Sequence, residues 1–100
     1  MPAYMIAKIN IHDAEQYKDY QRQVLPTIQQ FDGKILSVET DPAIIEGDWA
    51  CSYTVIIEWP SVERAKEWYD SDVYVEPKAL RQRTSSADLV FMRGLPKPPR

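Results

Sequence analysis

The spacing between apolar residues changes repeatedly along this chain, and those changes limit the possible folds more than any other feature. Apolar side chains first fill every second position from Tyr4 to Ile11, which predicts a strand with one apolar face. Asp13–Gln16 then has the layout of a helix cap, an Asp followed three residues later by Gln. Beyond it, steps of three and four residues predict an amphipathic helix. Its apolar positions are Tyr17, Tyr20, Val24, Ile28 and Phe31. We expect Pro26 to kink or split this helix and Gly33 to end it in a left-handed conformation.

The rest of the chain predicts three more strands and two more helices. The expected strands are Lys34–Glu39, Tyr53–Trp59 and Ala87–Arg93, with a short extension over Ala43–Glu46. Ser61 is placed to cap a second helix. The apolar positions of that helix are Val62, Ala65, Trp68 and Tyr69. Pro77 suits the first turn of a further short helix that continues through Leu80 and Arg83.

The resulting order of elements, β-α-β-β-α-β, is typical of a ferredoxin-like α+β sandwich. We expect residues 1–94 to form a single domain that closes at Gly94. Residues 95–100 contain three prolines and are expected to form a flexible, solvated tail. In this fold the helices cover one face of the sheet. The other face has no cover from its own chain.

The uncovered face is predicted to mix apolar and polar side chains. Its expected members are Tyr4, Ile6, Ile35 and Ile56 with Lys8, Asn10, Thr54 and Glu58. Such a face is too apolar to be left in water, so we expect a homodimer in which two copies pack these faces together. Lys8 and Glu58 are expected within ion-pair reach of each other, either as a surface pair or as part of an enclosed site. Glu58 is also the best candidate for an acid–base carboxylate whose pKa is raised by burial, although a neighbouring lysine would favour its ionised form and a structural charge pair.

Composition excludes several classes of function. The net charge of −3 argues against a protein that binds nucleic acid by neutralising phosphates. The longest aliphatic run, Val55–Ile57, is far shorter than the roughly 20 apolar residues of a membrane helix. Cys51 is the single cysteine and the start of the chain lacks a signal-peptide pattern, so we expect a cytoplasmic protein. Three glycines form no phosphate-binding loop, and no spacing suits a metal site, so neither cofactor nor metal is expected.

Four residues that could suggest chemistry are interpreted as structural. His12 directly precedes the expected helix cap, where a side chain is normally exposed, so we expect it to be a bystander. Cys51 has no Cys or His nearby in the sequence and is expected to be a passive thiol. Trp59 and Trp68 are expected in the core.

Three further residues have open roles. Trp49 and Tyr74 are aromatic residues in or near expected loops, where a planar ligand could bind. Arg81 could orient a carboxylate or phenolate through its planar guanidinium, or it could pair structurally with Glu46 or Asp48. Residues 73–100 hold six basic and two acidic residues, a balance that favours contact between subunits or attraction of a small anion. Together with Glu58, these residues are the candidate ligand-binding set.

Several short segments share their order and spacing with a known family. They are Asp13–Tyr17 with Tyr20, Ile45–Trp49, Ile57–Ser61 with Ala65, Trp68–Ser71 with Tyr74, Leu80–Arg81, and Ala87–Val90 before Gly94. Through them, the region from Tyr4 to Gly94 resembles the domain-of-unknown-function 1330 family of the dimeric α/β barrel superfamily, and it departs from that family mainly at Glu39–Thr40 and Cys51. The resemblance implies the fold and the homodimer. It implies no catalytic residue, because the family has no agreed reaction.

The leading hypothesis is a homodimeric protein that binds a small aromatic or acidic metabolite between sheet, helices and partner. The first alternative is a cofactor-independent enzyme on a small aromatic or lactone substrate. This alternative draws on the resemblance, since other members of the superfamily include cofactor-free monooxygenases, lactone isomerases and haem-handling enzymes. The second alternative is a purely structural or interaction module.

Overall fold

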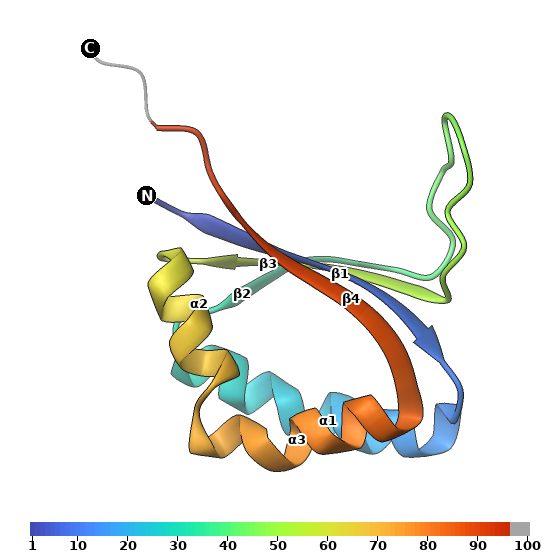
Figure 1. Ribbon diagram of the computed structural model, residues 1–100, viewed down its shortest axis with the longest axis horizontal. Coiled ribbons are helices and arrows are strands. Elements are labelled where there is room, and N and C mark those ends of the chain that lie inside the picture. Colours follow the sequence, from blue (N-terminus) through green and yellow to red (C-terminus); the bar gives the residue numbers. More distant parts are fainter. Residues whose placement is uncertain (97–100) are drawn as a thin grey trace.

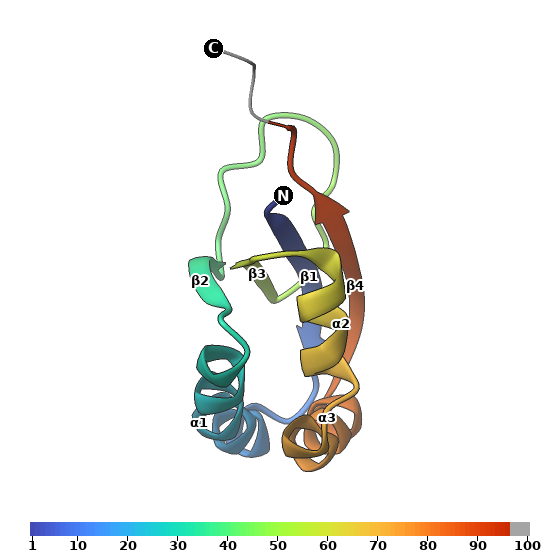
Figure 2. The same ribbon diagram turned by 90° about the vertical axis from the view of Figure 1, so that its left-hand side faces the viewer.

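The computed structural model describes residues 1–96. Its elements are β1 (Ala3–Ile11), α1 (Ala14–Gln30), β2 (Lys34–Glu39), β3 (Tyr53–Trp59), α2 (Val62–Tyr69), α3 (Asp72–Thr84) and β4 (Ser85–Arg93). The strands form one antiparallel sheet in the order β2-β3-β1-β4. All three helices lie on one side of it (Figures 1 and 2). The expected ferredoxin-like α+β fold is confirmed. The last four residues of the expected tail lie outside the described residues.

The core lies between the sheet and the helices. Side chains directly opposite each other in neighbouring strands share a face, so the register identifies the rows that point toward the helices. One such row is Leu89, Ala7, Val55 and Val38, and the next is Phe91, Met5, Ile57 and Ile35. The two central strands, β1 and β3, supply the buried members of these rows. No helix within residues 1–96 has the length and apolar character needed to cross a membrane.

Both expected helix caps are present. The Asp13 carboxylate accepts a hydrogen bond from the Gln16 backbone N–H at 3.1 Å, and the Ser61 hydroxyl accepts one from the Arg64 N–H at 3.0 Å. However, α1 is not split at Pro26 but continues through it to Gln30. Pro26 is exposed, so water can bond the carbonyl that the proline leaves without an N–H partner.

Two other boundaries differ from expectation. The helix α3 begins at Asp72, so Pro77 lies inside it rather than in its first turn. Burial of Tyr74 and Pro77 against the rest of the protein offsets the hydrogen bond that this proline removes. Ala43–Glu46 forms no strand but belongs to an irregular loop, residues 40–52. In Figure 1 this loop extends beyond the sheet on the side away from the helices, where no other strand is available to pair with it.

The chain leaves α1 in a way that the sequence did not indicate. The residue with a left-handed backbone is Asp32, with φ of 68°, and not Gly33. Gly33 is needed for space instead: a Cβ at this position would lie 2.6 Å from Ile28 Cγ2 and 2.8 Å from Trp59 Cζ3. The turn closes with the Gly33 N–H donating to the Ile28 carbonyl at 2.9 Å.

A β-bulge in β2 corrects the expected content of the open face. The register shifts between Ile35 and Ser37, so that Ile35 pairs with Ile57 and Val38 pairs with Val55. Because both partners point toward the helices, Ile35 lies on the helix side and not on the open face. The bulge adds one residue, which is why a simple alternation assigned Ile35 and Val38 to opposite faces.

Candidate functional site

A cavity of about 160 Å³ lies between the sheet and the helices. All four strands and all three helices contribute to its wall. The lining residues are Met5, Ala7, Ile9, Tyr17, Tyr20, Gln21, Val24, Leu25, Ile28, Ile35, Val38, Tyr53, Val55, Ile57, Trp68, Arg81 and Leu89. This wall is mostly aliphatic and aromatic, and it contains one charged residue. No carboxylate, imidazole or thiol is among these lining residues.

The charged residue, Arg81, is buried, with only 4% of its surface exposed. Its Nε donates a hydrogen bond to the Tyr74 hydroxyl at 3.2 Å. None of the ion pairs found within residues 1–96 includes Arg81. A buried charge without an opposite charge is costly, by several kcal/mol in the usual case, because water no longer solvates it. The cavity therefore holds a cation that lacks an anion of its own.

Tyrosine hydroxyls surround this cation. The Tyr20 and Tyr74 hydroxyls lie 3.0 Å apart and share a hydrogen bond, and the rings of Tyr17 and Tyr20 are in contact with centroids 5.2 Å apart. Burial is the main factor that raises the pKa of both Tyr17 and Tyr20, with smaller contributions from Tyr53 and Tyr74 respectively. At neutral pH these phenols are uncharged, so they cannot neutralise Arg81.

The guanidinium itself stays charged. Burial acts to lower the pKa of Arg81, but the neighbouring hydroxyls, Tyr74 foremost and then Tyr20, raise it by more, so the net shift is upward. A protonated guanidinium has five N–H donors, and the bond to Tyr74 uses one of them. The others are suited to the paired oxygens of a carboxylate or to a phenolate.

The raised tyrosine pKa values predict a loss of stability in alkali. In the unfolded chain a tyrosine loses its proton at about pH 10, whereas folded Tyr17 and Tyr20 keep theirs to higher pH. Above pH 10 the folded state therefore binds more protons, and each pH unit costs about 1.4 kcal/mol per tyrosine. Urea unfolding at pH 8, 10 and 11 measures this. Above pH 10, the free energy of unfolding should decrease less steeply with pH in Tyr17→Phe than in the native protein. An equally steep decrease in both proteins would contradict the raised pKa of Tyr17.

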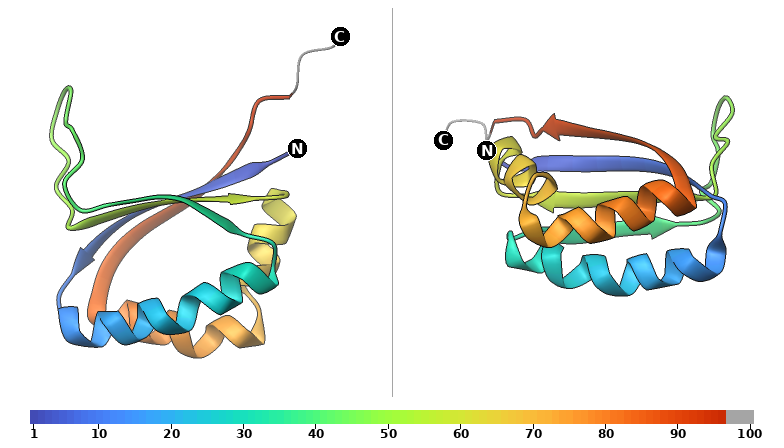
Figure 3. Two further views of the ribbon diagram at one scale, coloured as in Figure 1. Left: turned by 180° about the vertical axis from the view of Figure 1, so that it is seen from behind. Right: turned by 60° about the horizontal axis from the view of Figure 1, so that its bottom comes forward.

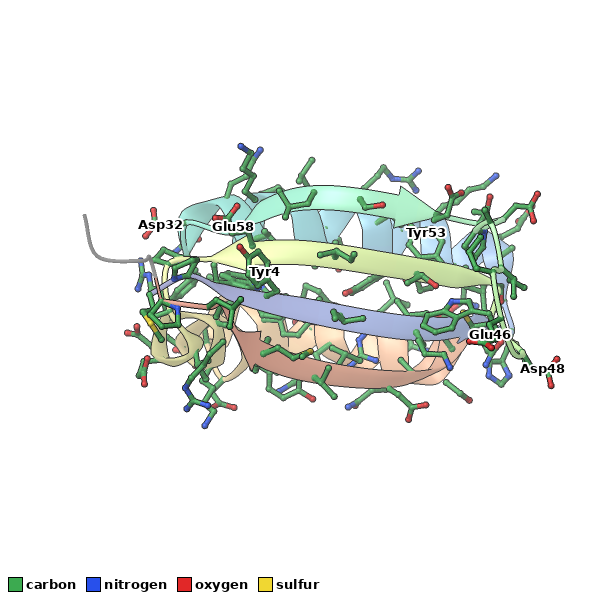
Figure 4. The ribbon with its side chains drawn as sticks, turned by 90° about the horizontal axis from the view of Figure 1, so that it is seen from above. Tyr4, Asp32, Glu46, Asp48, Tyr53 and Glu58 are labelled. Carbon is green, nitrogen blue, oxygen red and sulfur yellow. The ribbon has the colours of Figure 1, made fainter. Side chains whose placement is uncertain are left out.

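The structure brings two of the four candidate residues together, Tyr74 and Arg81. Trp49 lies in the loop 40–52 and is 40% exposed, with its Nε1 donating to Thr54 Oγ1 at 2.9 Å. Glu58 lies at the opposite end of the sheet from that loop, as Figure 4 shows from its position relative to Glu46. Neither Trp49 nor Glu58 lines the cavity around Arg81.

The expected proximity of Lys8 and Glu58 is wrong. In the register, Lys8 stands opposite Thr54, while Glu58 stands opposite Tyr4, four residues away along the strand. The Lys8 ammonium instead lies over the ring of Trp49, 4.4 Å from its centroid. Strand adjacency alone could not give this result, because the pairing depends on which residues of the two strands are aligned.

The expected partners of Arg81 also lie elsewhere. Glu46 and Asp48 are exposed residues of the loop 40–52 (Figure 4), and neither pairs with Arg81. His12 is exposed, as expected, and its Nε2 lies 2.8 Å from the Ser86 hydroxyl. Within residues 1–96 no group of three or more His, Cys, Asp or Glu residues could hold a metal ion.

Three tyrosines and one glutamine line the cavity without having been predicted as site residues: Tyr17, Tyr20, Tyr53 and Gln21. Tyr17 and Tyr20 were assigned to the apolar stripe of α1, and they do belong to the buried core. Gln21, on the same helix, donates from Nε2 to the Tyr53 hydroxyl at 3.0 Å. The available signal was the number of hydroxyls on an otherwise apolar helix face, since aliphatic residues would fill a simple core without polar groups.

Comparisons with known proteins agree with this fold. The protein RPA0582 from Rhodopseudomonas palustris, described as of unknown function, is 23% identical, with a TM-score of 0.78 over 97% of this chain and 84% of that chain. SnoaB, a cofactor-independent oxygenase from Streptomyces nogalater, is 8% identical, with a TM-score of 0.71 over 99% and 98% of the two chains. Identities this low establish similarity of fold alone.

No curated protein matches the chain. A family model, however, matches residues 2–95, which is nearly the whole sequence. The match includes β1 through β4 and every residue that lines the cavity. The chain therefore belongs to the family described as a domain of unknown function, DUF1330.

Proposed function

We propose that this protein binds a small aromatic acid or phenol in the cavity between the sheet and the helices. The main support for this proposal is Arg81, a buried cation that lines the cavity and pairs with no carboxylate within residues 1–96. An anionic ligand supplies the missing charge, and the aromatic and aliphatic wall packs against its ring. Tyr74 acts as a positioning residue, because its hydroxyl fixes the Nε side of the guanidinium.

The size of the cavity supports a ligand with one ring. An apolar cavity of about 150 Å³ accommodates benzene, so about 160 Å³ is enough for one substituted ring and not for a fused polycyclic system. The space is explained by one small side chain in the row formed by Leu89, Ala7, Val55 and Val38, which points toward the helices. Ala7 is the smallest member and stands near the middle of the sheet.

The lining also favours binding over acid–base catalysis. A general base needs a pKa near the working pH, but burial raises the pKa values of Tyr17 and Tyr20, and no carboxylate or imidazole is present among the lining residues. A cofactor-independent reaction, as named for the similar fold of SnoaB, is therefore the second candidate. It would require a substrate acidic enough to ionise beside Arg81 without a protein base.

Benzoate binding tests the role of Arg81. The Arg81→Gln substitution removes a charge-assisted hydrogen bond, so the affinity for benzoate should fall about 10- to 100-fold. The affinity for the neutral analogue benzyl alcohol should change little. Arg83→Gln is the matched control, because Arg83 lies in the same last turn of α3 but is exposed. Isothermal titration calorimetry provides the affinities, and circular dichroism checks that each variant is folded.

Two results would contradict the proposal. One is equal affinity of the native protein for benzoate and benzyl alcohol, which would mean that Arg81 does not strengthen the binding of an anionic ligand. The other is an equal loss in Arg81→Gln and Arg83→Gln, which would indicate a general effect of charge. Oxygen uptake with a quinol, measured without added cofactor, separates simple binding from the second candidate.

We further propose that the protein is a homodimer, joined through the face of the sheet that the helices leave open (Figure 2). The register places Ile6 between Ile56 and Val90 on this face, and Tyr4 beside Met92. Val90 and Met92 are about half exposed in the single chain. A contiguous apolar surface of this kind is typical of an interface, and a second copy supplies a matching one.

We also propose a cytoplasmic location. Cys51, the single cysteine, is compatible with that reducing compartment.

Light scattering measures the assembly directly. We expect twice the chain mass of 11.6 kDa for the native protein and a shift toward monomer for Val90→Lys, which places a charge in the interface. Val75→Lys is the control, because Val75 is 53% exposed on α3 and Val90 is 52% exposed on β4. A native monomer, or equal behaviour of the two variants, would contradict this interface.

A further inference from the structure

The cavity has a second property that Arg81 does not explain: its entrance is apolar and open to solvent. Leu25, Ile35 and Val38 all line the cavity, yet they are 42%, 38% and 47% exposed. These three residues form what we call the mouth. Most of the remaining aliphatic and aromatic lining, such as Ile57 and Trp68, is nearly completely buried, whereas Tyr53 and Leu89 are partly buried. The cavity therefore leads from a buried cation to an exposed apolar rim.

The mouth depends on a local irregularity in β2. Ile35 and Val38 are three residues apart, so in a regular strand they would point to opposite faces of the sheet. The bulge between Ile35 and Ser37 brings both onto the helix side, beside Ile57 and Val55. Leu25 meets them from α1, which runs below β2 in the left view of Figure 3. Since β2 is an edge strand with every residue exposed, no further strand closes the opening.

Arg81 and the mouth belong to different elements of one cavity. Arg81 comes from α3, which lies below β4 in Figure 2, while the mouth lies at β2 on the other edge of the sheet and at Leu25 of α1. A cavity of about 160 Å³ is filled by a single ring. A ligand that also covers the exposed side chains of the mouth therefore needs an additional apolar part.

We propose that the ligand is amphipathic: an aromatic acid or phenol with its oxygen atoms at Arg81 and an alkyl-type substituent that passes out between Leu25, Ile35 and Val38. This inference rests on the proposed function and specifies its substrate class. The substituent covers apolar side chains that otherwise face water, which gives the exposed mouth a role. The Gln21–Tyr53 pair, hydrogen-bonded at 3.0 Å, forms the polar part of the wall near the same edge.

A ligand series with one variable length tests the proposal. Benzoate and its 4-ethyl and 4-butyl derivatives are titrated calorimetrically against the native protein. Each buried methylene should strengthen binding by about fourfold until the chain emerges from the mouth. In Val38→Asn the gain from the butyl group should largely disappear, so that the ratio of 4-butylbenzoate affinity to benzoate affinity falls toward one. Leu36→Asn is the matched control, because Leu36 is 46% exposed on the same strand but does not line the cavity.

The outcomes separate this inference from the proposed function. If the native protein binds benzoate and 4-butylbenzoate equally, the amphipathic ligand is overturned and the anion site at Arg81 stands. If neither compound binds, the proposed function itself fails. Equal effects of Val38→Asn and Leu36→Asn on the butyl compound would also overturn the inference. So would a drop in the dimer mass in Val38→Asn without any effect of alkyl length, because a second copy would then cover the mouth.

Discussion

Replacing Trp68 with alanine is expected to lower the free energy of unfolding by about 3–5 kcal/mol, the usual cost of deleting a buried aromatic ring. Trp68 has no exposed surface. Its ring lies 4.1 Å from that of Tyr74 and 5.0 Å from that of Trp59, measured between centroids. It is thus the central ring of the packing between α2, α3 and β3. Domains are commonly stable by only 5–15 kcal/mol, so the variant should be marginally folded.

A second effect adds to the loss of packing. The Trp68 indole N–H donates to the Thr27 hydroxyl at 3.0 Å, and that hydroxyl donates to the Val24 carbonyl at 2.6 Å. Alanine removes the first bond and leaves the Thr27 oxygen with one fewer partner in a buried position. Because Trp68 also lines the cavity, its removal enlarges the space beside Arg81. Ligand affinity should therefore fall together with stability.

Trp49→Ala is the control for this prediction. It makes the same chemical change at a residue that is 40% exposed and whose indole N–H bonds only Thr54. We expect a cost of about 1 kcal/mol or less, from that hydrogen bond and the contact with the Lys8 ammonium. Denaturant unfolding measures both variants. Similar costs for Trp49→Ala and Trp68→Ala would show that the central packing role of Trp68 is wrong.

The elements of this fold were largely predictable because each depends on local information. The caps at Asp13 and Ser61 are fixed by residues within three positions of each other, and β3 is found at the boundaries that its alternation predicted. The burial of Trp59 and Trp68 was predictable for a similar reason, since both fall on apolar faces. The errors occur where a non-local fact decides the outcome. The bulge in β2, which moves Ile35 to the helix side, depends on pairing with β3.

The candidate site was predictable only in part, for the same physical reason. Arg81 and Tyr74 were among the predicted site residues, but the role of Arg81 was left open between a ligand contact and a structural pair with Glu46 or Asp48, because the sequence does not show which element faces α3. The structure instead places Arg81 beside the hydroxyl of Tyr74 on α3, which in turn contacts that of Tyr20 on α1. A buried cation without a counterion is a property of three-dimensional packing. No spacing between residues along the chain reveals it.

Replacing Gly33 with alanine is expected to lower the free energy of unfolding by about 3 kcal/mol, the upper end of the usual cost of overpacking a core. The added Cβ would lie 2.6 Å from Ile28 Cγ2, 2.8 Å from Trp59 Cζ3 and 2.9 Å from Trp59 Cη2. Neither neighbour can move freely, since Ile28 is 3% and Trp59 is 1% exposed. The backbone of Gly33 has no positive φ, so this cost arises from space alone.

Gly47→Ala separates that steric cost from backbone strain. Gly47 has φ of +81°, and a Cβ there would have no atom within 4 Å, so its substitution should cost about 1–2 kcal/mol from strain only. A double-mutant cycle then tests the contact itself. In an Ile28→Ala background the nearest obstacle to the new Cβ is gone, so Gly33→Ala should cost less than it does in the native protein. An unchanged cost would mean that Ile28 does not enforce glycine at this turn, and that the rings of Trp59 alone set the limit on how closely the chain can pass between α1 and β2.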